Sequence, residues 1–449
     1  MLTDLTEDER MKKVVKFGGS SLADANQFKK VGAIIREDDA RRYVVPSAPG
    51  KRFPSDTKVT DMLYGCYDKA ANDEDFTNDL KAIKARYQEI IDDLALDFSL
   101  ENEFEIIEEN FKNKMGRDYA ASRGEYLNGM IMAAYLGYEF IDAKDVIVFD
   151  ENGVFLDNET NTILGERLAQ CECAVIPGFY GAKPDGSIQT FTRGGSDLTG
   201  SIVAKAIQAD MYENWTDVSG FLLVDPRIVK DPAPIEVITY KELRELSYMG
   251  ATVIHESAMF PIIKEGIPIH ILNTNRPQDK GTLIVESTCR KPKYTITGIA
   301  GKKGFASITI EKAMMNSEVG FCRKVLTVFE EEGISIEHMP SGIDTMTIFV
   351  HQDEFEEHEQ RVIAAIHRAV EPDTVELESD LALIAVVGRG MKQTRGTAGR
   401  IFAALAHAHV NVKMIDQGSS ELNIIIGVRT HDFNRAISAI YDIFVETQI

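Results

Sequence analysis

Four short motifs in the first half of the chain place glycines beside charged and hydroxyl side chains, a combination suited to binding anions. The first, residues 16–21 (KFGGSS), directly follows an apolar run. Adjacent glycines let backbone N–H groups approach a ligand closely, a following helix N-terminus favours phosphate, and Lys16 adds a full positive charge. The motif therefore indicates a phosphate-binding loop, although a strand-to-helix turn that binds nothing would also fit these letters.

Two further motifs combine glycine with a charge that could recognise an amino acid. Residues 122–125 (SRGE) offer Glu125, which can receive a substrate ammonium group or simply complement the start of a helix expected from residue 126. Residues 192–197 (TRGGSD) offer Arg193, whose planar fork can bind a carboxylate bidentately. Ser196 or Asp197 is expected to cap the helix that follows.

The fourth motif, residues 216–220 (TDVSG), precedes the triplet Asp225-Pro226-Arg227. Its threonine, aspartate and backbone groups could hold the base and ribose of a nucleotide, with Arg227 near the phosphates. A turn at the end of a strand, marked by the proline, explains the same residues without a ligand.

Elements that could position these motifs alternate along the first two-thirds of the chain. Residues 13–17, 43–46 and 146–149 predict buried strands, and residues 27–36 and 197–208 predict helices. This alternation predicts an α/β domain with a largely parallel sheet. Residues 67–112 are acidic, with apolar residues three and four positions apart, and predict a helical subdomain that packs on the sheet.

The last third of the chain contains an internal repeat. A basic stretch at residues 288–293 reads as a linker, and beyond it two similar segments are offset by about 76 positions, as from Gly320 to Gly396. Each predicts a helix followed by a strand, at residues 334–336 in one copy and 410–412 in the other. Each copy therefore predicts a ferredoxin-like β-α-β-β-α-β unit.

Composition excludes several classes of protein. The 449 residues carry a net charge of −22, which argues against a nucleic-acid or anionic membrane surface as partner. The acidic start has no signal-peptide pattern, and the most apolar run, residues 381–387, is too short to span a bilayer. Five cysteines make an odd number and favour a reducing cytoplasm. The Cys171-x-Cys173 pair lacks further ligands, so we expect no protein metal site.

Together and in this order, KFGGSS, SRGE, TRGGSD and TDVSG…DPR, followed by two ferredoxin-like repeats, resemble the aspartate kinases over essentially the whole chain. The resemblance implies an α/β amino-acid-kinase (carbamate-kinase-like) domain at residues 1–292. It also implies tandem ACT domains at residues 293–378 and 379–449.

The resemblance also implies roles for individual residues. The residues that it implies for catalysis are Lys16 and Asp197. Those implied for aspartate binding are Ser47, Thr60, Glu125, Arg193 and Ser196. Those implied for nucleotide binding are Lys16, Gly18, Gly19, Ser20, Thr216, Asp217, Asp225 and Arg227. Three features depart from the family pattern: Thr252 replaces a lysine, Leu222 replaces a tyrosine, and residues 50–59 look like an insertion.

The implied reaction transfers a phosphoryl group from ATP to the side-chain carboxylate of L-aspartate, the first step toward lysine, threonine and methionine. Mg²⁺ would be held mainly by the phosphates. An amino-acid effector, lysine first and threonine second, would bind the first repeat at Ser317, Gly320, Glu337, Ser341 and Asp344. The repeats would also pair subunits into a homodimer or homotetramer, and pairing alone is the alternative role.

Two alternatives to this activity stay open at the level of sequence. One is another kinase of the same fold, acting on glutamate, acetylglutamate, carbamate or a nucleotide. The other is an amino-acid sensor without catalysis, against which the presence of Lys16, Glu125, Arg193 and Asp197 argues.

Overall fold

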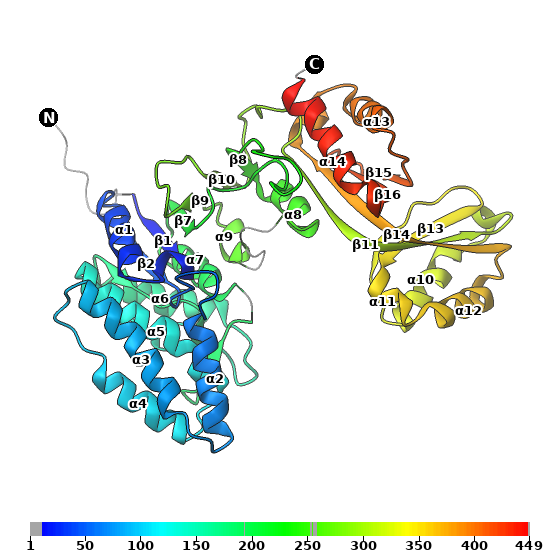
Figure 1. Ribbon diagram of the computed structural model, residues 1–449. Coiled ribbons are helices and arrows are strands. Elements are labelled where there is room, and N and C mark those ends of the chain that lie inside the picture. Colours follow the sequence, from blue (N-terminus) through cyan, green and yellow to red (C-terminus); the bar gives the residue numbers. More distant parts are fainter. Residues whose placement is uncertain (1–10, 193, 252–253, 255–257, 448–449) are drawn as a thin grey trace. The chain divides into compact units, whose positions relative to one another are not determined.

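The computed structural model describes residues 11–192, 194–251, 254 and 258–447, and the chain divides into two compact units (Figure 1). The first comprises residues 1–221, 236–240 and 253–288, and the second comprises residues 222–235, 241–252 and 289–449. The sequence did not indicate that the two short segments, 222–235 and 241–252, group with the C-terminal half. The predicted domain limits at residues 292 and 378 stay predictions.

The first unit contains alternating strands and helices. In chain order they are β1 (Lys13–Phe17), the 3₁₀ turn η2 (Gly19–Leu22), α1 (Ala25–Arg36), β2 (Arg41–Pro46), α2 (Val59–Ala71), α3 (Thr77–Asp93), α4 (Glu101–Lys112), α5 (Arg117–Leu136), β3 (Glu139–Phe140), α6 (Asp157–Leu168), β4 (Ala174–Val175), β5 (Tyr180–Ala182), β6 (Ile188–Thr190), α7 (Gly195–Ala206), β7 (Met211–Thr216), β8 (Val237–Thr239), α9 (Phe260–Ile263), β9 (Ile269–Asn273) and β10 (Thr282–Val285). Helix α8 (Tyr240–Tyr248) follows β8 and continues into residues of the second unit.

An eight-stranded sheet forms the centre of this unit, in the order β3-β4-β2-β1-β7-β9-β10-β8. The pairs from β3 to β9 are parallel, and β10 joins β9 antiparallel. The predicted α/β class and the strands near residues 13 and 43 are confirmed. The strand predicted at residues 146–149 is wrong: Val148 and Phe149 form only isolated bridges, and the Val148 N–H donates to the Thr160 hydroxyl instead of joining a ladder (3.0 Å).

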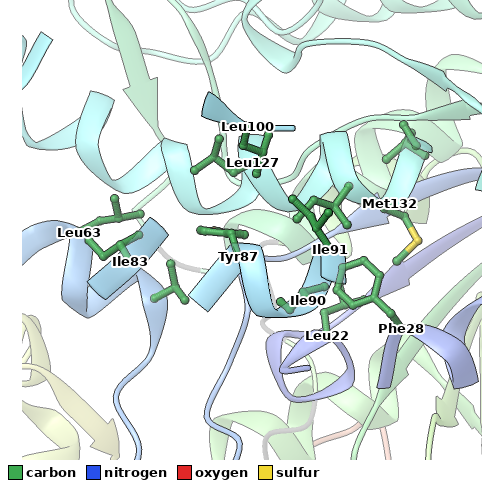
Figure 2. Close-up of a cluster of buried hydrophobic side chains, with 14 of the residues drawn as sticks. Leu22, Phe28, Leu63, Ile83, Tyr87, Ile90, Ile91, Leu100, Leu127 and Met132 are labelled. Carbon is green, nitrogen blue, oxygen red and sulfur yellow. The ribbon is translucent and has the colours of Figure 1, made fainter. Parts of the chain in front are cut away.

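Helices α1–α5 enclose the main apolar core together with one face of the sheet. Helix α3 buries Leu80, Ile83, Tyr87 and Ile90, which recur every three or four residues and therefore share one side of the helix. Figure 2 shows Tyr87, Ile83 and Ile90 among side chains of the neighbouring helices, such as Leu63 of α2 and Leu127 of α5. The predicted helical subdomain within residues 67–112 is confirmed.

The second unit contains the repeats. Its elements beyond residue 289 are β11 (Gly298–Glu311), α10 (Phe321–Glu331), β12 (Ile336–His338), β13 (Thr345–His351), α11 (Gln352–Glu356), α12 (Glu359–Val370), β14 (Thr374–Val387), α13 (Thr397–His407), β15 (Met414–Asp416), β16 (Asn423–Arg429), α14 (Phe433–Tyr441) and a final π-helical turn (Asp442–Glu446). The strands form one six-stranded sheet in the order β12-β13-β11-β14-β16-β15.

The two repeats share their long strands, β11 and β14, which run side by side in Figure 1. The C-terminal part of β11 pairs with β13 and with the start of β14, completing the first repeat. The N-terminal part of β11, Gly298–Lys303, pairs with residues 382–387 of β14 and so supplies the fourth strand of the second repeat. The ferredoxin-like pattern is confirmed. In the second copy, however, one of the four strands comes from Gly298–Lys303, which precedes the first repeat in the sequence.

Both short repeat strands begin later than the sequence predicts. The predicted strands start at Ile334 and Val410, whereas the structure has β12 from Ile336 and β15 from Met414. The N–H groups of Ile334 and Val410 instead donate to the helix carbonyls of Phe329 and Leu405, at 2.9 Å each. These two residues therefore satisfy carbonyl groups in the last turn of the preceding helix, and the extended strand begins after them.

None of the helices in the described ranges is both long enough and apolar enough to cross a membrane.

Candidate active site

A buried polar triad joins the ends of two strands to a helix. The Lys16 ammonium lies 2.6 Å from the Asp197 carboxylate, and both side chains are mostly buried. The side-chain amide of Asn214 donates to the same carboxylate oxygen at 2.8 Å. The backbone carbonyl of Asp197 accepts from the Tyr212 hydroxyl at 3.0 Å, which fixes the first turn of α7 against β7. A cation and a neutral donor thus share one acid at the edge of the sheet.

Strand register explains why these side chains meet. Lys16 of β1 and Asn214 of β7 are directly paired in parallel strands. Because side chains alternate across a strand, both point away from the core cluster that contains Phe17 and Trp215. They therefore point toward α7, which supplies Asp197. Asn214 was missed in the sequence, where its only signal was a polar pair, Glu213-Asn214, in the middle of a strand between Tyr212 and Trp215.

The start of α7 differs from the prediction that Ser196 or Asp197 caps it. The helix begins at Gly195 after Gly194, which has a left-handed backbone (φ 59°), and no side chain caps it. A Cβ on Gly195 would meet the Phe179 ring at 2.4 Å, so this position has no room for a side chain. The Asp197 carboxylate is consequently free to pair with Lys16.

The glycine motif lies against a second loop that follows β2. The Gly50 N–H donates to the Gly19 carbonyl at 2.8 Å. A Cβ on Gly19 would lie 2.9 Å from the Ala48 carbonyl, and one on Gly50 would lie 2.5 Å from Gly19. The glycines are required because two backbones touch here. The strand-to-helix turn is therefore present, with a 3₁₀ turn at Gly19–Leu22 before helix α1 begins at Ala25.

A cavity of about 670 Å³ opens between these loops. Its lining includes eight of the residues predicted for substrates, namely Gly18, Gly19, Ser20, Ser47, Thr60, Glu125, Thr216 and Asp217. Lys16 lies beside it, since a Cβ on Gly18 would be 3.6 Å from the Lys16 ammonium. The structure therefore brings the KFGGSS, SRGE and TDVSG motifs to one place. The remaining lining comes from residues 48–51, 53, 54 and 58.

Glu125 is buried at the wall of this cavity. It lies within α5, which starts at Arg117, so the predicted junction before residue 126 is wrong. Burial raises the pKa of its carboxyl from 4.5 to about 8, while the Ala48 N–H, a hydrogen-bond donor to it, opposes the rise. The Oε2 atom has no hydrogen-bond partner among the described residues. An unpaired buried acceptor of this kind suits an ammonium group.

Two neutral residues support the wall around Glu125. Gly124 lets α5 approach the loop after β2, because a Cβ there would lie 2.8 Å from that of Ala48. The Asn128 side chain donates to the Ser47 carbonyl at 2.6 Å and so ties this loop to α5. Asn128 was also missed in the sequence, where an asparagine inside a helix carries no distinctive pattern.

The turn after β7, which is predicted to contact the base of the nucleotide, is hydrogen-bonded to residues at the end of β9. The Asn273 side chain donates to the Asp217 carbonyl at 3.2 Å and to the Ser219 hydroxyl at 2.9 Å. Thr216 accepts, through its carbonyl, from the Thr274 N–H at 2.9 Å. These contacts fix the turn after β7 next to the cavity.

Among the described residues, the lining of this cavity does not include Ser196, Asp225 or Arg227. Arg193 and Thr252 lie outside the described residues. Ser196 is half-buried, and its side chain packs against the backbone of Gly178. Asp225 and Arg227 fall in the second unit, where the Arg227 guanidinium binds the Asp225 carboxylate at 2.5 Å and lowers its pKa.

The predicted effector residues lie at the helix-and-hairpin end of the first repeat. Gly320, with φ 84°, precedes α10, and the Asp344 carboxylate accepts from the Met314 N–H at 3.0 Å. Glu337 of β12 is already engaged, because the Tyr248 hydroxyl donates to one of its oxygens at 2.7 Å and His351 lies 3.2 Å from the other. Ser317 and Ser341 are exposed.

Within the residues that the structure describes, no group of three or more histidine, cysteine, aspartate or glutamate side chains could hold a metal ion. The carboxylates that line the cavity, Glu125 and Asp217, come from different elements, α5 and the turn after β7. These residues fit a magnesium ion that arrives with a nucleotide and is held mainly by phosphate oxygens and water.

Comparison with known proteins places the chain among related sequences and folds. The profile described as the amino acid kinase family matches residues 11–273, and one described as an ACT domain matches residues 384–444. Aspartokinase 3 of Bacillus subtilis (strain 168) is 41% identical over 448 residues, which cover 96% of this chain and 98% of that protein. The Clostridium acetobutylicum aspartate kinase structure is 51% identical, with a TM-score of 0.88, and covers 97% of this chain and 100% of its own.

Escherichia coli aspartokinase III has the same fold. Its structure with aspartate and ADP matches at 22% identity and a TM-score of 0.70. Its structure with lysine and aspartate matches at 23% identity and a TM-score of 0.71. Each match covers 96% of this chain and 99% of the other.

Proposed function

The chain belongs to the aspartokinases of the amino acid kinase family, and we propose that it transfers the γ-phosphoryl group of ATP to the side-chain carboxylate of L-aspartate. The products are 4-phospho-L-aspartate and ADP. The observation that carries this assignment is the convergence of Lys16, the glycine loop and Glu125 on one cavity. We propose that the reaction opens the synthesis of lysine, threonine and methionine.

The aspartate ammonium group would bind Glu125. The unpaired Oε2 atom of this residue can accept an N–H bond, and the substrate's positive charge would favour the ionised form of a carboxyl that is otherwise neutral at pH 7. Ser47 and Thr60 line the same cavity and offer hydroxyl groups to the substrate. Arg193 would clamp the α-carboxylate, as expected from the sequence, with Ser196 beside it.

The phosphates of ATP would bind the backbone N–H groups of Gly18, Gly19 and Ser20. Lys16 beside this loop would neutralise charge on the transferred group, and Asp197 would orient the Lys16 ammonium through their ion pair. Thr216 and Asp217 would contact the nucleoside. Roles for Asp225 and Arg227 at the nucleotide stay proposals. Mg²⁺, held mainly by phosphate oxygens and water, would supply further positive charge near the transferred group.

No strong general base is required in this reaction. The substrate carboxylate is already ionised at neutral pH and is itself the nucleophile. Its attack on phosphorus forms the acyl phosphate bond as the bond to ADP breaks, so no proton has to move. The chain's contribution is therefore positioning and cancellation of negative charge, the usual terms in phosphoryl transfer. This explains why a chain of net charge −22 concentrates Lys16 and backbone donors at the cavity.

Regulation by an amino acid is the second part of the proposal. The Clostridium relative is described as an allosteric enzyme, and the E. coli relative has been solved with lysine, so lysine is the first effector to test and threonine the second. Binding would involve Ser317, Gly320, Glu337, Ser341 and Asp344 of the first repeat. A homodimer or homotetramer formed through the repeats, and a cytoplasmic location, also stay proposals.

The deciding experiment measures ADP release with and without aspartate, together with trapping of the acyl phosphate by hydroxylamine. We expect ADP release and hydroxamate to appear only with aspartate, and not with glutamate, acetylglutamate or carbamate. Added lysine or threonine then tests inhibition in the same assay. Release with glutamate in place of aspartate would favour another kinase of this fold. No release with any acceptor would favour an amino-acid sensor.

A further inference from the structure

Residues 50–59, the segment that departs from the family pattern, form a closed loop beside the glycine motif. At one end the Gly50 N–H donates to the Gly19 carbonyl at 2.8 Å. At the other end the Val59 N–H donates to the Pro49 carbonyl at 3.2 Å. Both ends of the loop are therefore fixed next to each other and next to Gly19.

A buried arginine holds this loop from α3. The Arg86 side chain is 4% exposed, and its guanidinium donates to the Gly50 carbonyl at 2.7 Å and to the Asp56 carboxylate at 3.0 Å. Arg52 donates to the same carboxylate from its side chain and its backbone, at 2.9 Å each. Arg86 therefore binds both the first residue of the loop, Gly50, and its distal residue, Asp56. These contacts stabilise one conformation of the loop beside the cavity.

Two lysines stand at the ends of the loop and line the cavity. Lys51 adjoins Gly50 and Lys58 adjoins Val59, so both lie near the point where the loop meets Gly19. Both side chains are exposed, and neither forms an ion pair within the described part of the chain. Across the 449 residues acids outnumber bases by 71 to 49, so two cations without carboxylate partners at one cavity are available to an anion.

We propose that Lys51 and Lys58 bind the phosphates of the nucleotide and that Arg86 is the residue that positions them. A nucleoside triphosphate at Gly18–Ser20 would present its non-bridging oxygens to the adjoining loop ends. Ammonium groups suit such oxygens because they act as mobile point charges. This inference rests on the proposed placement of the nucleotide at the glycine loop, and adds two charge contacts to it.

Steady-state kinetics of Lys51→Ala, Lys58→Ala and the double variant test the lysines. We expect KM for ATP to rise roughly fivefold for each lysine, with KM for aspartate unchanged. The dependence of KM for ATP on salt should weaken as well, because screened charge contacts have been removed. The matched control is Lys29→Ala with Lys81→Ala, two exposed lysines of α1 and α3 away from the cavity. An unchanged KM for ATP in the double variant, or a rise in KM for aspartate instead, would overturn the proposal.

The positioning role of Arg86 is tested by a double-mutant cycle. Arg86→Met should raise KM for ATP more than it lowers kcat, and Arg86→Lys should restore part of the affinity. In the background that lacks both lysines, Arg86→Met should have little further effect on KM for ATP, because it acts through them. Fully additive effects would show that Arg86 does not position the lysines. Thermal melting of each variant identifies any loss of folded protein.

Failure of this inference is distinguishable from failure of the proposed function. If wild-type protein releases no ADP with aspartate, the proposed function is wrong. If it does, and Lys16→Ala abolishes the release while the loop variants keep wild-type kinetics, only the role of Lys51 and Lys58 is wrong.

Discussion

The Lys16 ammonium and the Asp197 carboxylate form an ion pair of 2.6 Å that joins the end of β1 to the first turn of α7. The pair connects the glycine loop, which follows Lys16, with the TRGGSD motif, which contains Asp197. Because both side chains are mostly buried, each would be costly to leave unpaired. The ion pair therefore orients the Lys16 ammonium toward the cavity beside the glycine loop, where phosphoryl transfer is proposed.

Replacing Lys16 and replacing Arg193 should have different kinetic effects. Lys16→Ala should lower kcat by about 100-fold or more, the usual effect of removing a group that stabilises transition-state charge. Arg193→Ala should instead raise KM for aspartate by roughly 10- to 100-fold, since it removes the charged group proposed to hydrogen-bond the α-carboxylate. Initial-rate kinetics with both substrates varied will separate the effects. Wild-type kinetics in both variants would show that the site is wrongly assigned.

Asn214 should be needed for turnover although no sequence motif contains it. Its amide donates to Asp197 at 2.8 Å, so Asn214→Ala removes one of the two groups that hold this carboxylate within the described part of the chain. We expect kcat to fall by about tenfold. Asn214→Asp should be more harmful, because a second carboxylate would face Asp197. Asn26→Ala on the exposed side of α1 is the control. Full activity of Asn214→Asp would contradict the proposed role.

Aspartate binding should depend on pH through Glu125. Its pKa is raised to about 8 by burial, so below that pH the residue is mostly neutral and must lose a proton before it can bind an ammonium group. The affinity for aspartate should therefore rise about tenfold per pH unit below pH 8, then level off. Calorimetry in buffers of different ionisation enthalpy should detect one proton released on binding at pH 7. Glu125→Gln should bind weakly and without this pH dependence.

The same carboxyl should make the wild-type protein less stable in base. A folded-state pKa above the unfolded value of 4.5 means that the stabilisation is complete below pH 4.5 and is lost as pH rises through 8. The Glu125→Gln variant has no carboxyl group at this position, so it does not lose this stabilisation as pH rises. Its melting temperature relative to wild type should therefore increase between pH 5 and pH 9. A difference in melting temperature that stays constant over this range would contradict the raised pKa.

The motifs and most elements of this site can be predicted from sequence because their information is local. Glycines next to Lys16, an arginine between a threonine and two glycines, and alternating apolar runs each have a meaning within a few residues. Asn214 could not be found in this way. Its importance comes from the register of β1 against β7, which pairs it with Lys16, and a single sequence does not contain that register.

The remaining errors also come from packing between distant segments. The sequence predicts a junction at SRGE because glycine favours loops, but tertiary contact with Ala48 keeps Gly124 inside α5. The sequence predicts two self-contained repeats, but residues 298–303 are added to the second copy by pairing with β14. In both cases the local conformational preference of the sequence contributes less free energy than the packing with distant segments.

Gly124→Ala should reveal how closely α5 approaches the loop after β2. A new Cβ would lie 2.8 Å from that of Ala48, closer than carbon atoms tolerate, so the loop that carries Ser47 must shift. We expect a loss of stability of about 1–3 kcal/mol from overpacking, together with weaker aspartate binding. Gly65→Ala in α2 is the matched control. It meets no atom within 4 Å and should stabilise the protein by about 0.5–1 kcal/mol. Denaturant melts will give both values, and equal effects would show that the close approach is unimportant.

Tyr248 should weaken effector binding by competing for Glu337. Its hydroxyl donates to one oxygen of Glu337 at 2.7 Å while His351 lies 3.2 Å from the other, so an effector ammonium must share or displace these partners. Tyr248→Phe should therefore strengthen lysine binding about threefold, the value of one exposed hydrogen bond, whereas Glu337→Gln should weaken it. Calorimetric titration with lysine measures both.

The control for Tyr248 is Tyr294→Phe, which removes a hydroxyl that has no hydrogen-bond partner among the described residues of the same unit. It should leave the affinity for lysine unchanged. If Tyr248→Phe also leaves the affinity unchanged while Glu337→Gln abolishes binding, then the effector uses Glu337 without displacing the tyrosine. If Glu337→Gln has no effect either, the ammonium group binds elsewhere, and Asp344 at the other side of the hairpin becomes the residue to replace.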